Sequence, residues 1–372
     1  MEVDARVVTG ADEVLVVNVG SSSVKLRLLD GGETVLAERD LAAPGGDDDP
    51  LRAALAGFTG VRLVGHRVVH GGTRFHAAAV VDDDVRAALG ELVHLAPLHQ
   101  PPALAALDIA REHLPGATHV ACFDTAFHAT LPAAASTYAV PAAWRDRLGV
   151  RRYGFHGLSH AFAARRASEL LGRASEGLRL VTCHLGAGAS LCAVRGGTSV
   201  DTTMGFTPLE GLVMATRSGS VDPGLVLWLI RSAGLEPGAV EDALERHSGL
   251  LGLAGTADMR DIVTRAAGGE DVCALALAVY AHRLGAAIAA MTTSLGGLDA
   301  LVFTGGVGER APVVRRSAAE KLGHIGIGVD EALNAAATGD ADAEISASGA
   351  PVRTVVIRAR EDIEIARQAR AV

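Results

Sequence analysis

The sequence predicts an α/β protein built from two similar halves, and three observations support this fold class. Apolar strand-like runs alternate with helical patterns along all 372 residues, which is typical of layered α/β folds. The segments Val16–Leu28 and Thr182–Val194 repeat one pattern of apolar strand, polar residue, small-residue turn and apolar strand. A third small-residue turn follows the apolar strand within Leu301–Arg310 and leads into a helix. Three such turns at strand ends predict two related halves around one cleft.

The first half opens with a β-hairpin over Val14–Asp30. Two apolar runs flank a Gly-Ser-Ser-Ser turn, and the second run alternates apolar side chains with Lys25 and Arg27. Asn18 ends the first strand, where an amide without a partner would cost free energy. We therefore expect a site at this turn. Lys25 is one of only two lysines in the chain, and it is either part of that site or an ordinary exposed strand residue.

The remaining elements alternate along the chain. Residues 43–50 are expected to form a solvated loop before a short helix, and Thr118–Phe127 resembles a strand. Residues 201–224 look least like helix or strand, and long ordered loops of this kind are usually functional. Helices are expected at 84–94, 102–114, 159–171, 222–233, 238–247, 272–295, 310–322 and from 361 onward, and further strands at 179–185, 189–195, 299–304 and 353–359.

Composition indicates a soluble globular protein, large enough for two cores, with 49% hydrophobic and 21% charged residues. The formal net charge of -9 argues against nucleic acid as the main partner. The first residues lack the apolar run of a signal peptide, and His282 and Arg283 interrupt the Ala-rich stretch 274–295, so it is expected to be a core helix. The four cysteines form no CxxC pair, which favours buried free thiols in a reducing cytoplasm.

The turns of small residues suit an anion, because successive backbone N–H groups can surround a phosphate. Each turn taken alone is as readily an ordinary hairpin turn, but three together favour phosphate binding. The sequence contains no GxxxxGK[ST] motif, which excludes a P-loop protein, and no GxGxxG opens a first βαβ unit.

Several charged and polar side chains occur where catalytic groups are often found. Arg67 lies in an apolar strand before a Gly-Gly turn, and a buried arginine needs either an internal carboxylate or an anionic ligand. Asp124 follows a strand, where it serves either a site or a turn. His99 lies in a proline-rigid loop, and Arg217 lies in the long loop. His156, just before a helix, is either a site residue or a packed core histidine.

Ten motifs resemble the acetate kinase family, in that family's order and over nearly the whole chain. They are NVGSSSVK, GHRVVHGG, APLHQPP, FDTAFH, YGFHGLSH, HLGAGAS, DTTMGFTPLEGL, TRSGSVDPG, FTGGVGE and REDIEIAR. The family belongs to the sugar kinase, Hsp70 and actin superfamily. The resemblance implies two duplicated actin-like (ribonuclease H-like) domains with the active site in the cleft between them. The implied bounds are 1–127 plus 363–372 for the N-terminal domain and 128–362 for the C-terminal domain.

The resemblance also implies an activity: reversible, direct in-line phosphoryl transfer from ATP to acetate, giving ADP and acetyl phosphate. Mg²⁺ would assist, with Mn²⁺ as an alternative, held by Asn18 and Glu361. The implied catalytic residues are Arg67, Asp124, His156 and Arg217. The implied acyl pocket, beside Arg67, consists of Val69, Leu98, Phe155 and Pro208. The implied nucleotide site consists of Ser21, Ser22, Lys25, His184, Gly186, Gly188, Asp258, Arg260, Gly305, Gly306 and Gly308. His99 would line the cleft.

This chemistry has a physical rationale. A carboxylate is already ionised at neutral pH, so the nucleophile needs no general base. The obstacle is repulsion between an anion and a polyanionic triphosphate, which two arginines, Mg²⁺ and a donating histidine would relieve. The chain departs from the family at a few positions: Ala187 and Gln100 stand where Asn is usual, Arg310 and Arg360 also replace Asn, and Asp362 replaces Glu. The change at Ala187 bears on nucleotide affinity or choice of phosphoryl donor.

Three alternatives to an acetate kinase remain open at this point. A propionate or butyrate kinase of the same family would differ only in pocket size, because one methylene changes discrimination by about 1–3 kcal/mol. A non-catalytic nucleotide-binding protein would not need all four implied catalytic residues. A metal hydrolase is disfavoured, since no HExxH motif is present. The resemblance implies a cytoplasmic homodimer, formed through the C-terminal domain, with no nucleic-acid or membrane partner.

Overall fold

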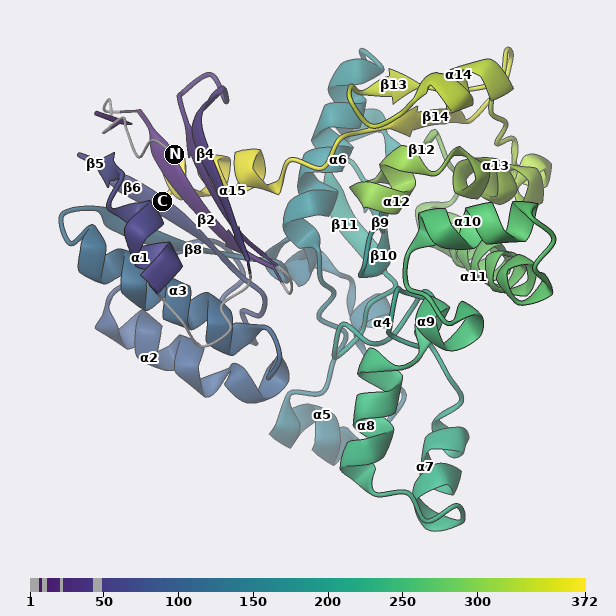
Figure 1. Cartoon of the computed structure of the whole chain (residues 1–372), viewed down its shortest axis with the longest axis horizontal. Helices are drawn as coiled ribbons and strands as arrows, with labels where there is room; N and C mark the ends of the chain where they lie inside the picture. The colour runs from purple at the N-terminus through teal and green to yellow at the C-terminus, as the bar shows by residue number, and fades with distance from the viewer. Residues whose placement is uncertain (1–6, 9–11, 21–22, 43–48) are drawn as a thin grey trace. The chain divides into compact units, whose positions relative to one another are not determined.

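The structure is a computed structural model that describes residues 7–8, 12–20, 23–42 and 49–372 (Figure 1). Backbone contacts divide the chain into two compact units, which we describe separately. Unit 1 consists of the described residues of Met1–Ala129, Gly157–Phe162 and Arg360–Val372, and unit 2 consists of Thr130–His156 and Ala163–Ala359. The domain bounds expected from the sequence assign residues 128–129, 157–162 and 360–362 to the C-terminal domain, whereas backbone contacts place them in unit 1. The expected bounds stay a prediction.

Unit 1 is built on a six-stranded sheet with strand order β4-β3-β2-β6-β8-β7. Its strands are β2 (Val14–Val19), β3 (Ser23–Leu29), β4 (Val35–Ala42), β6 (Leu63–Val68), β7 (Ala79–Val80) and β8 (Thr118–Phe123). Its helices are α1 (Asp49–Leu55), α2 (Asp83–Glu91), α3 (Gln100–His113) and α15 (Glu361–Arg370). A short parallel pair joins β1 (Val7–Val8) to β5 (Phe58–Thr59). Leu15, Leu26 and Val64 of the sheet form a buried core with Ala106 and Ile109 of α3.

Unit 2 is built on a second six-stranded sheet with strand order β11-β10-β9-β12-β14-β13. Its strands are β9 (Arg179–Leu185), β10 (Ala189–Arg195), β11 (Thr198–Thr202), β12 (Ala300–Thr304), β13 (Ala343–Glu344) and β14 (Arg353–Val356). Helices of this unit are α4 (Ala133–Ser136), α5 (Ala142–Leu148), α7 (Pro223–Arg231), α8 (Pro237–Arg246), α9 (Gly249–Ala254), α10 (Met259–Ala267), α11 (Asp271–Leu295), α12 (Gly305–Arg310), α13 (Pro312–Lys321) and α14 (Glu331–Ala336). Helix α6 (Gly157–Leu170) starts in unit 1 and continues into unit 2.

The two sheets have the same plan. In each, two antiparallel pairings are followed by two parallel pairings and a final antiparallel one. The sequence repeat therefore matches β2 and β3 of unit 1 with β9 and β10 of unit 2. The predicted fold class, a duplicated α/β protein, is confirmed.

Helix α11 is the one described helix that is long and apolar enough to cross a membrane by length and composition. It packs against β9, β10 and β11 and against α13, and residues such as Tyr280, Leu284 and Ile288 are buried. This packing is that of the core helix expected from the sequence. The four cysteines are buried and free, as predicted.

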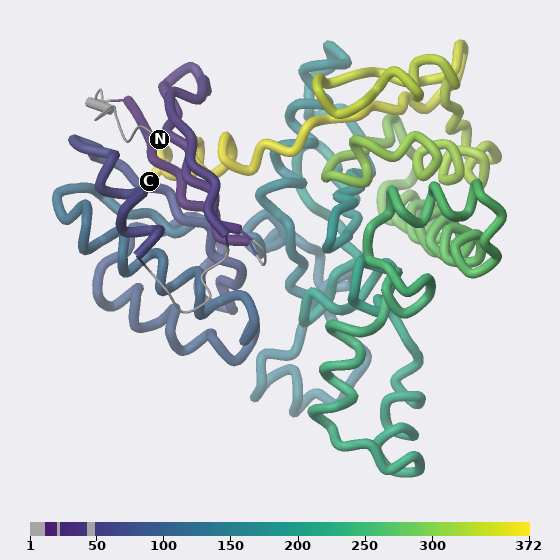
Figure 2. The backbone as a smooth tube through the Cα atoms, in the orientation of Figure 1, coloured from purple at the N-terminus to yellow at the C-terminus, as the bar shows by residue number. Residues whose placement is uncertain are grey.

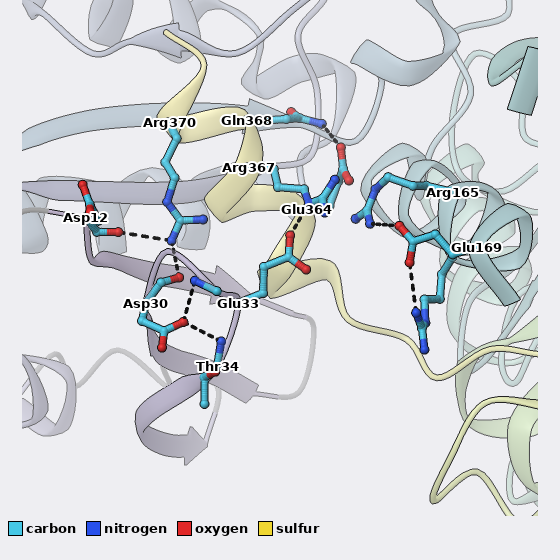
Figure 3. A network of polar contacts seen from close by, with 12 residues as sticks. Asp12, Asp30, Glu33, Thr34, Arg165, Glu169, Glu364, Arg367, Gln368 and Arg370 are labelled. Atoms are coloured by element: carbon cyan, nitrogen blue, oxygen red, sulfur yellow. Dashed lines mark hydrogen bonds and ion pairs between the residues drawn. The ribbon is translucent and has the colours of Figure 1, made fainter. Parts of the chain in front are cut away.

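Helix α15 brings the end of the chain back to the first strands. It packs against β2 and β6, as the yellow and purple segments of Figure 2 show. Arg370 Nη2 donates to the Asp30 carbonyl at 2.7 Å, and Arg367 forms an ion pair with Glu33 (Figure 3). These contacts fix the C-terminal end of α15 on the β3–β4 turn, so the helix presents its first residue, Glu361, at a defined place in unit 1.

Most expected elements are present, including β9 and β10 with the predicted bounds. The helix expected at 310–322 is α13, and a separate short helix, α12, precedes it within the glycine turn. The sequence did not predict β4 or β11. Strand β4 is half-exposed and has no clean alternation, and its pairing with β3 defines it.

Candidate active site

In unit 1, Arg67 and Asp124 come from neighbouring parallel strands. Arg67 lies on β6 opposite Cys122, and Asp124 directly follows β8. Arg67 Nε lies 3.2 Å from both Asp124 carboxylate oxygens, Nη2 lies 2.6 Å from Oδ2, and Nη1 donates to the Val19 carbonyl at 3.1 Å. The Asp124 side chain is only 2% exposed. The sheet therefore supplies a buried, firmly held guanidinium.

The electrostatics of this pair keep Arg67 charged. Burial disfavours its charged form, but the carboxylates of Asp124 and Glu361 raise the pKa of the guanidinium. Burial raises the pKa of Asp124, and the facing Arg67 opposes that shift. Because the arginine remains a cation, its guanidinium is a fixed positive charge held by Asp124 rather than a titrating acid or base.

Asn18 and Glu361 lie together in the same unit. Asn18 Nδ2 donates to Glu361 Oε2 at 2.9 Å, so the amide predicted to need a partner has one. Carboxylate and amide oxygens are hard donors, and Mg²⁺ is usually held by one or two carboxylates together with phosphates and water. Across the described residues, no group of three or more His, Cys, Asp or Glu is placed to hold a metal. The donor set therefore fits Mg²⁺ completed by phosphate and water.

The residues of unit 1 that are expected to bind the acyl group or line the cleft lie just after β6 and just before α3. Val69 is buried just after β6, Leu98 is exposed, and His99 is the N-cap residue of α3. Gln100 is fully buried and binds the backbone of His70, accepting from its N–H at 3.2 Å and donating to its carbonyl at 3.1 Å. Gln100 therefore has a structural contact in this unit.

The opening hairpin turn is described only in part, because Ser21 and Ser22 lie outside the described residues. The Gly20 N–H donates to the Ser23 carbonyl at 2.8 Å, which closes the turn. Lys25 is exposed on β3, in register with Asn18 on β2 and Asp40 on β4. Lys25 and Arg27 lower the pKa of Asp40, with the Arg27 hydrogen bond as the larger cause.

In unit 2, a pair of stacked histidines lies at the turn between β9 and β10. The rings of His156 and His184 stack with centroids 4.4 Å apart. His156 Nδ1 lies 2.9 Å from Ser190 Oγ, which orients the ring. His156 has a left-handed backbone with φ of 58°, which is rare for a residue other than glycine and marks functional positions. A Cβ on Gly188 would lie 3.2 Å from the His156 ring, so a larger residue there would press on the ring.

Arg217 belongs to the long irregular segment between β11 and α7. Its Nε lies 3.3 Å from Glu245 Oε2, and its Nη1 donates to the Pro208 carbonyl at 3.3 Å. The Gly188 position is again close, because a Cβ there would lie 3.6 Å from Arg217 Nη1. Unit 2 thus places His156 and Arg217 beside Gly188, with His184 stacked on His156 and Pro208 in contact with Arg217. Phe155, next to His156 in sequence, is buried.

The long segment is ordered by a polar network. Arg152 donates through Nη1 to the carbonyls of Thr203 and Met204, each at 3.0 Å, and through Nη2 to Glu210 at 2.7 Å. Tyr138 donates to the same Glu210 carboxylate. The segment is therefore the ordered loop that the sequence predicted.

A pocket of about 850 Å³ in unit 2 brings together part of the expected nucleotide site. Gly186, Asp258, Arg260 and Gly306 line it, together with Ala187 and Arg310. His184, Gly188, Gly305 and Gly308 are not among its lining residues. Asp258 accepts from the Arg260 N–H at 2.8 Å and caps α10, so these two residues also have a structural contact.

In the glycine turns of unit 2, the absence of a side chain allows close backbone contacts, and the backbone N–H groups donate hydrogen bonds within the protein. Gly305 N–H donates at 2.9 Å to Glu309 Oε1, which also accepts from the Ala359 N–H. Gly186 N–H donates to the Gly188 carbonyl at 2.9 Å. A Cβ on Gly305 would lie 2.8 Å from the Leu185 carbonyl, and its φ is +77°. Glycine at 305 therefore permits the close approach of β12 to β9, and its own N–H already has an acceptor.

Sequence reasoning did not identify Ser190 and Glu245, which contact the expected catalytic side chains. Ser190 was visible as the last residue of HLGAGAS, and its position on β10 opposite His184 was the available signal. Glu245 lies near the end of α8, 28 residues after Arg217 (245 − 217 = 28), and no motif marks it. A charged residue near the end of a helix gives no local signal of such a contact.

Comparison with known proteins agrees with this arrangement. A model of the acetokinase family matches residues 53–367. The acetate kinase of Deinococcus deserti is 46% identical, covering 96% of this chain and 97% of the relative. That of Leifsonia xyli subsp. xyli is 47% identical, covering 96% of this chain and 98% of the relative.

Solved structures give the same result. The acetate kinase of Porphyromonas gingivalis has a TM-score of 0.88 and 33% identity, covering 97% of this chain and 99% of that one. A propionate kinase from Francisella tularensis has a TM-score of 0.87 and 32% identity, covering 97% and 100%. With the family model spanning most of the sequence and these relatives covering nearly all of it, the chain belongs to the acetokinase family.

Proposed function

We propose that this chain is an acetate kinase, which transfers the terminal phosphoryl group of ATP to acetate and forms ADP and acetyl phosphate reversibly. The observation that carries the proposal is that each unit holds an arginine and a carboxylate that are both mostly buried, Arg67 with Asp124 and Arg217 with Glu245. Such guanidinium groups suit a reaction that brings an anionic nucleophile to a polyanionic phosphate. Family membership supports the same reaction.

In this proposal the two arginines bind the carboxylate and the transferring phosphoryl group and offset their mutual repulsion. Arginine suits this role because its planar fork donates to two oxygens at once. Asp124 holds Arg67 and removes no proton, since acetate is already ionised at neutral pH. His156 donates a hydrogen bond to the phosphoryl oxygens in flight, with Ser190 fixing its ring.

Asn18 and Glu361 are the residues that would hold Mg²⁺ or Mn²⁺, and the ion would neutralise phosphate charge. The pocket of unit 2 is proposed to take the nucleotide, with Gly186, Gly306, Asp258 and Arg260 in its wall. Val69 and Leu98 of unit 1 and Phe155 and Pro208 of unit 2 are proposed to contact the acyl methyl group. The roles in the site expected for His99, His184, Lys25 and the glycines outside the pocket wall stay predictions.

A hydroxamate assay for acyl phosphate tests the proposal directly. Purified protein is incubated with ATP and Mg²⁺ and with acetate, propionate or butyrate, and each mixture is repeated without ATP. We expect ATP-dependent acyl hydroxamate, with the highest kcat/KM for acetate. Product from propionate at a higher kcat/KM would favour the second candidate, a propionate kinase, which the likeness to the Francisella tularensis enzyme supports. ATP binding without any acyl phosphate would contradict both and favour a non-catalytic nucleotide-binding protein.

We propose further that the protein is a cytoplasmic homodimer formed through unit 2. Helix α7 exposes large apolar side chains, with Trp228 at 56% and Leu227 at 51% exposed. Exposed apolar surface of this kind favours burial against a partner. Light scattering on the purified protein measures the mass directly, and a monomer would contradict the proposal.

A further inference from the structure

We propose that Glu245 is a positioning residue for phosphoryl transfer: its carboxylate sets the orientation of the Arg217 guanidinium. The inference rests on the proposed function, in which Arg217 contacts the reacting anions. Glu245 itself touches neither substrate in this proposal.

Contacts on two sides define the plane of the guanidinium. Glu245 Oε2 lies 3.3 Å from Nε, and the Pro208 carbonyl accepts from Nη1 at 3.3 Å. The Arg217 side chain is 16% exposed and that of Glu245 is 15% exposed. A planar group that is paired with a carboxylate at Nε, donates from Nη1 and is largely shielded from water has little freedom to rotate.

The backbone holds Glu245 close to the Arg217 loop. Thr216 Oγ1 donates to the Glu245 carbonyl at 3.0 Å, and the Ser218 N–H donates to the Leu244 carbonyl at 3.0 Å. The residues on both sides of Arg217 are thus bonded to the last turn of α8. This docking brings the Glu245 carboxylate to Arg217 Nε through contacts of the protein itself.

The charges explain why a carboxylate is useful there. A mostly buried guanidinium without a counter-charge is costly, and it would turn toward any nearby acceptor. Burial raises the pKa of Glu245, and Arg217 opposes that shift, so the pair lies where water screens it weakly. The reaction rate is sensitive to small displacements of a group that stabilises the transition state.

Steady-state kinetics with a matched control tests the inference. Glu241, one helical turn earlier on α8, is exposed and carries the same charge, so Glu241→Gln is the control. We expect Glu245→Ala to lower kcat about tenfold with little change in KM, because a misoriented arginine loses transition-state contact. Glu245→Gln should lower kcat less, since its amide oxygen still accepts from Nε. In an Arg217→Lys background, Glu245→Ala should have almost no further effect on kcat, because both changes act through one contact.

A second measurement does not depend on activity. The Nε–H of Arg217 gives an NMR signal that Arg217→Lys identifies by its loss. We expect this signal to be protected from solvent exchange in wild type and in Glu241→Gln, and exposed in Glu245→Ala. Thermal unfolding confirms that each variant is folded. The inference is overturned if the protection is unchanged in Glu245→Ala, or if that variant keeps kcat within twofold of wild type. An absence of acyl phosphate formation by wild type contradicts the proposed function, while the NMR result still decides whether Glu245 orients Arg217.

Discussion

The two arginines are held in different ways. Asp124 binds Nε and Nη2 of Arg67 together, with the shortest distance at 2.6 Å, and the two residues come from adjacent strands of one sheet. Glu245 meets Arg217 at Nε, at 3.3 Å, from the end of a helix that is docked on an irregular loop. Both arginine side chains are similarly shielded, at 13% and 16% exposure.

The two arginines are therefore equally shielded from water, and they differ in the elements that hold them. Arg67 lies on a strand that is hydrogen-bonded on both sides, whereas Arg217 lies in an irregular loop that separate contacts, such as Ser218 N–H to the Leu244 carbonyl, tie to α8. Loops are the less stable parts of most folds, and they are the parts that move when ligands bind. We infer that the sheet itself holds Arg67, whereas Arg217 owes its orientation to a few separate contacts and loses that orientation when one of them is removed.

The largest effect is expected from changing the arginines themselves. Arg67→Lys and Arg217→Lys should each lower turnover on the order of 10²-fold or more, because lysine cannot replace a planar fork that stabilises developing charge. Acyl hydroxamate formation under saturating ATP and acetate measures the loss. Near-normal rates in both variants would remove these residues from the proposed mechanism.

The next largest difference is expected in the free energy of unfolding, between variants of the Arg67–Asp124 pair and of the Arg217–Glu245 pair. Asp124→Asn leaves a buried arginine without its counter-charge, and breaking such a pair typically costs about 3–5 kcal/mol. Glu245→Gln removes the negative charge but keeps an oxygen beside Arg217 Nε, and we expect a loss of about 1 kcal/mol in the free energy of unfolding. Urea denaturation followed by circular dichroism compares the two variants with Glu241→Gln. Equal losses would show that the sheet does not hold Arg67 more firmly than the loop holds Arg217.

Acid should weaken unit 1 before it affects the arginine pairs. His66 Nε2 lies 2.9 Å from His119 Nδ1 inside the sheet, and burial lowers the pKa of both imidazoles below 6.5. Burial also lowers the pKa of His70 to about 4. The unfolded chain therefore binds more protons than the folded one below about pH 6.5, so the free energy of unfolding falls as pH decreases through this range.

Hydrogen exchange measured by mass spectrometry at pH 7 and pH 5, corrected for intrinsic rates, checks this expectation. Peptides from β6 and β8 should lose more protection than peptides from β9 and β12. His119→Gln removes one of the buried imidazoles, and it should reduce the difference between the two pH values. An equal change in both units would contradict the assignment to these histidines.

The smallest expected effect concerns the nucleotide pocket of unit 2. Ala187 is exposed in the pocket wall, where the family usually has Asn. One added hydrogen bond is worth about 0.5–1.5 kcal/mol, so Ala187→Asn should lower the KM for ATP a few-fold with kcat unchanged. The same KM in wild type and variant would indicate that the nucleotide phosphates do not approach residue 187.

Much of the fold could be predicted from local patterns. The apolar run of β2 and the alternation of β3 predicted a hairpin, and β9 and β10 have the predicted bounds, because strands buried on both faces read as short continuous apolar runs. Strand β4 was missed, since an edge strand with mixed exposure carries no such period. The roles of Arg67, Asp124, His156 and Arg217 came from family motifs, and they remain predictions.

By itself, the sequence determined the α/β class, the duplication, the small-residue turns and the buried arginine that needs an anion. Tertiary structure alone decided which partners meet: Arg67 with Asp124 across 57 residues, His156 with Ser190 across 34, and Arg217 with Glu245. It also decided that Glu309, rather than a ligand, accepts from the Gly305 N–H. The physical reason is that periodicity and turn chemistry are local, whereas an ion pair depends on where packing brings two distant side chains.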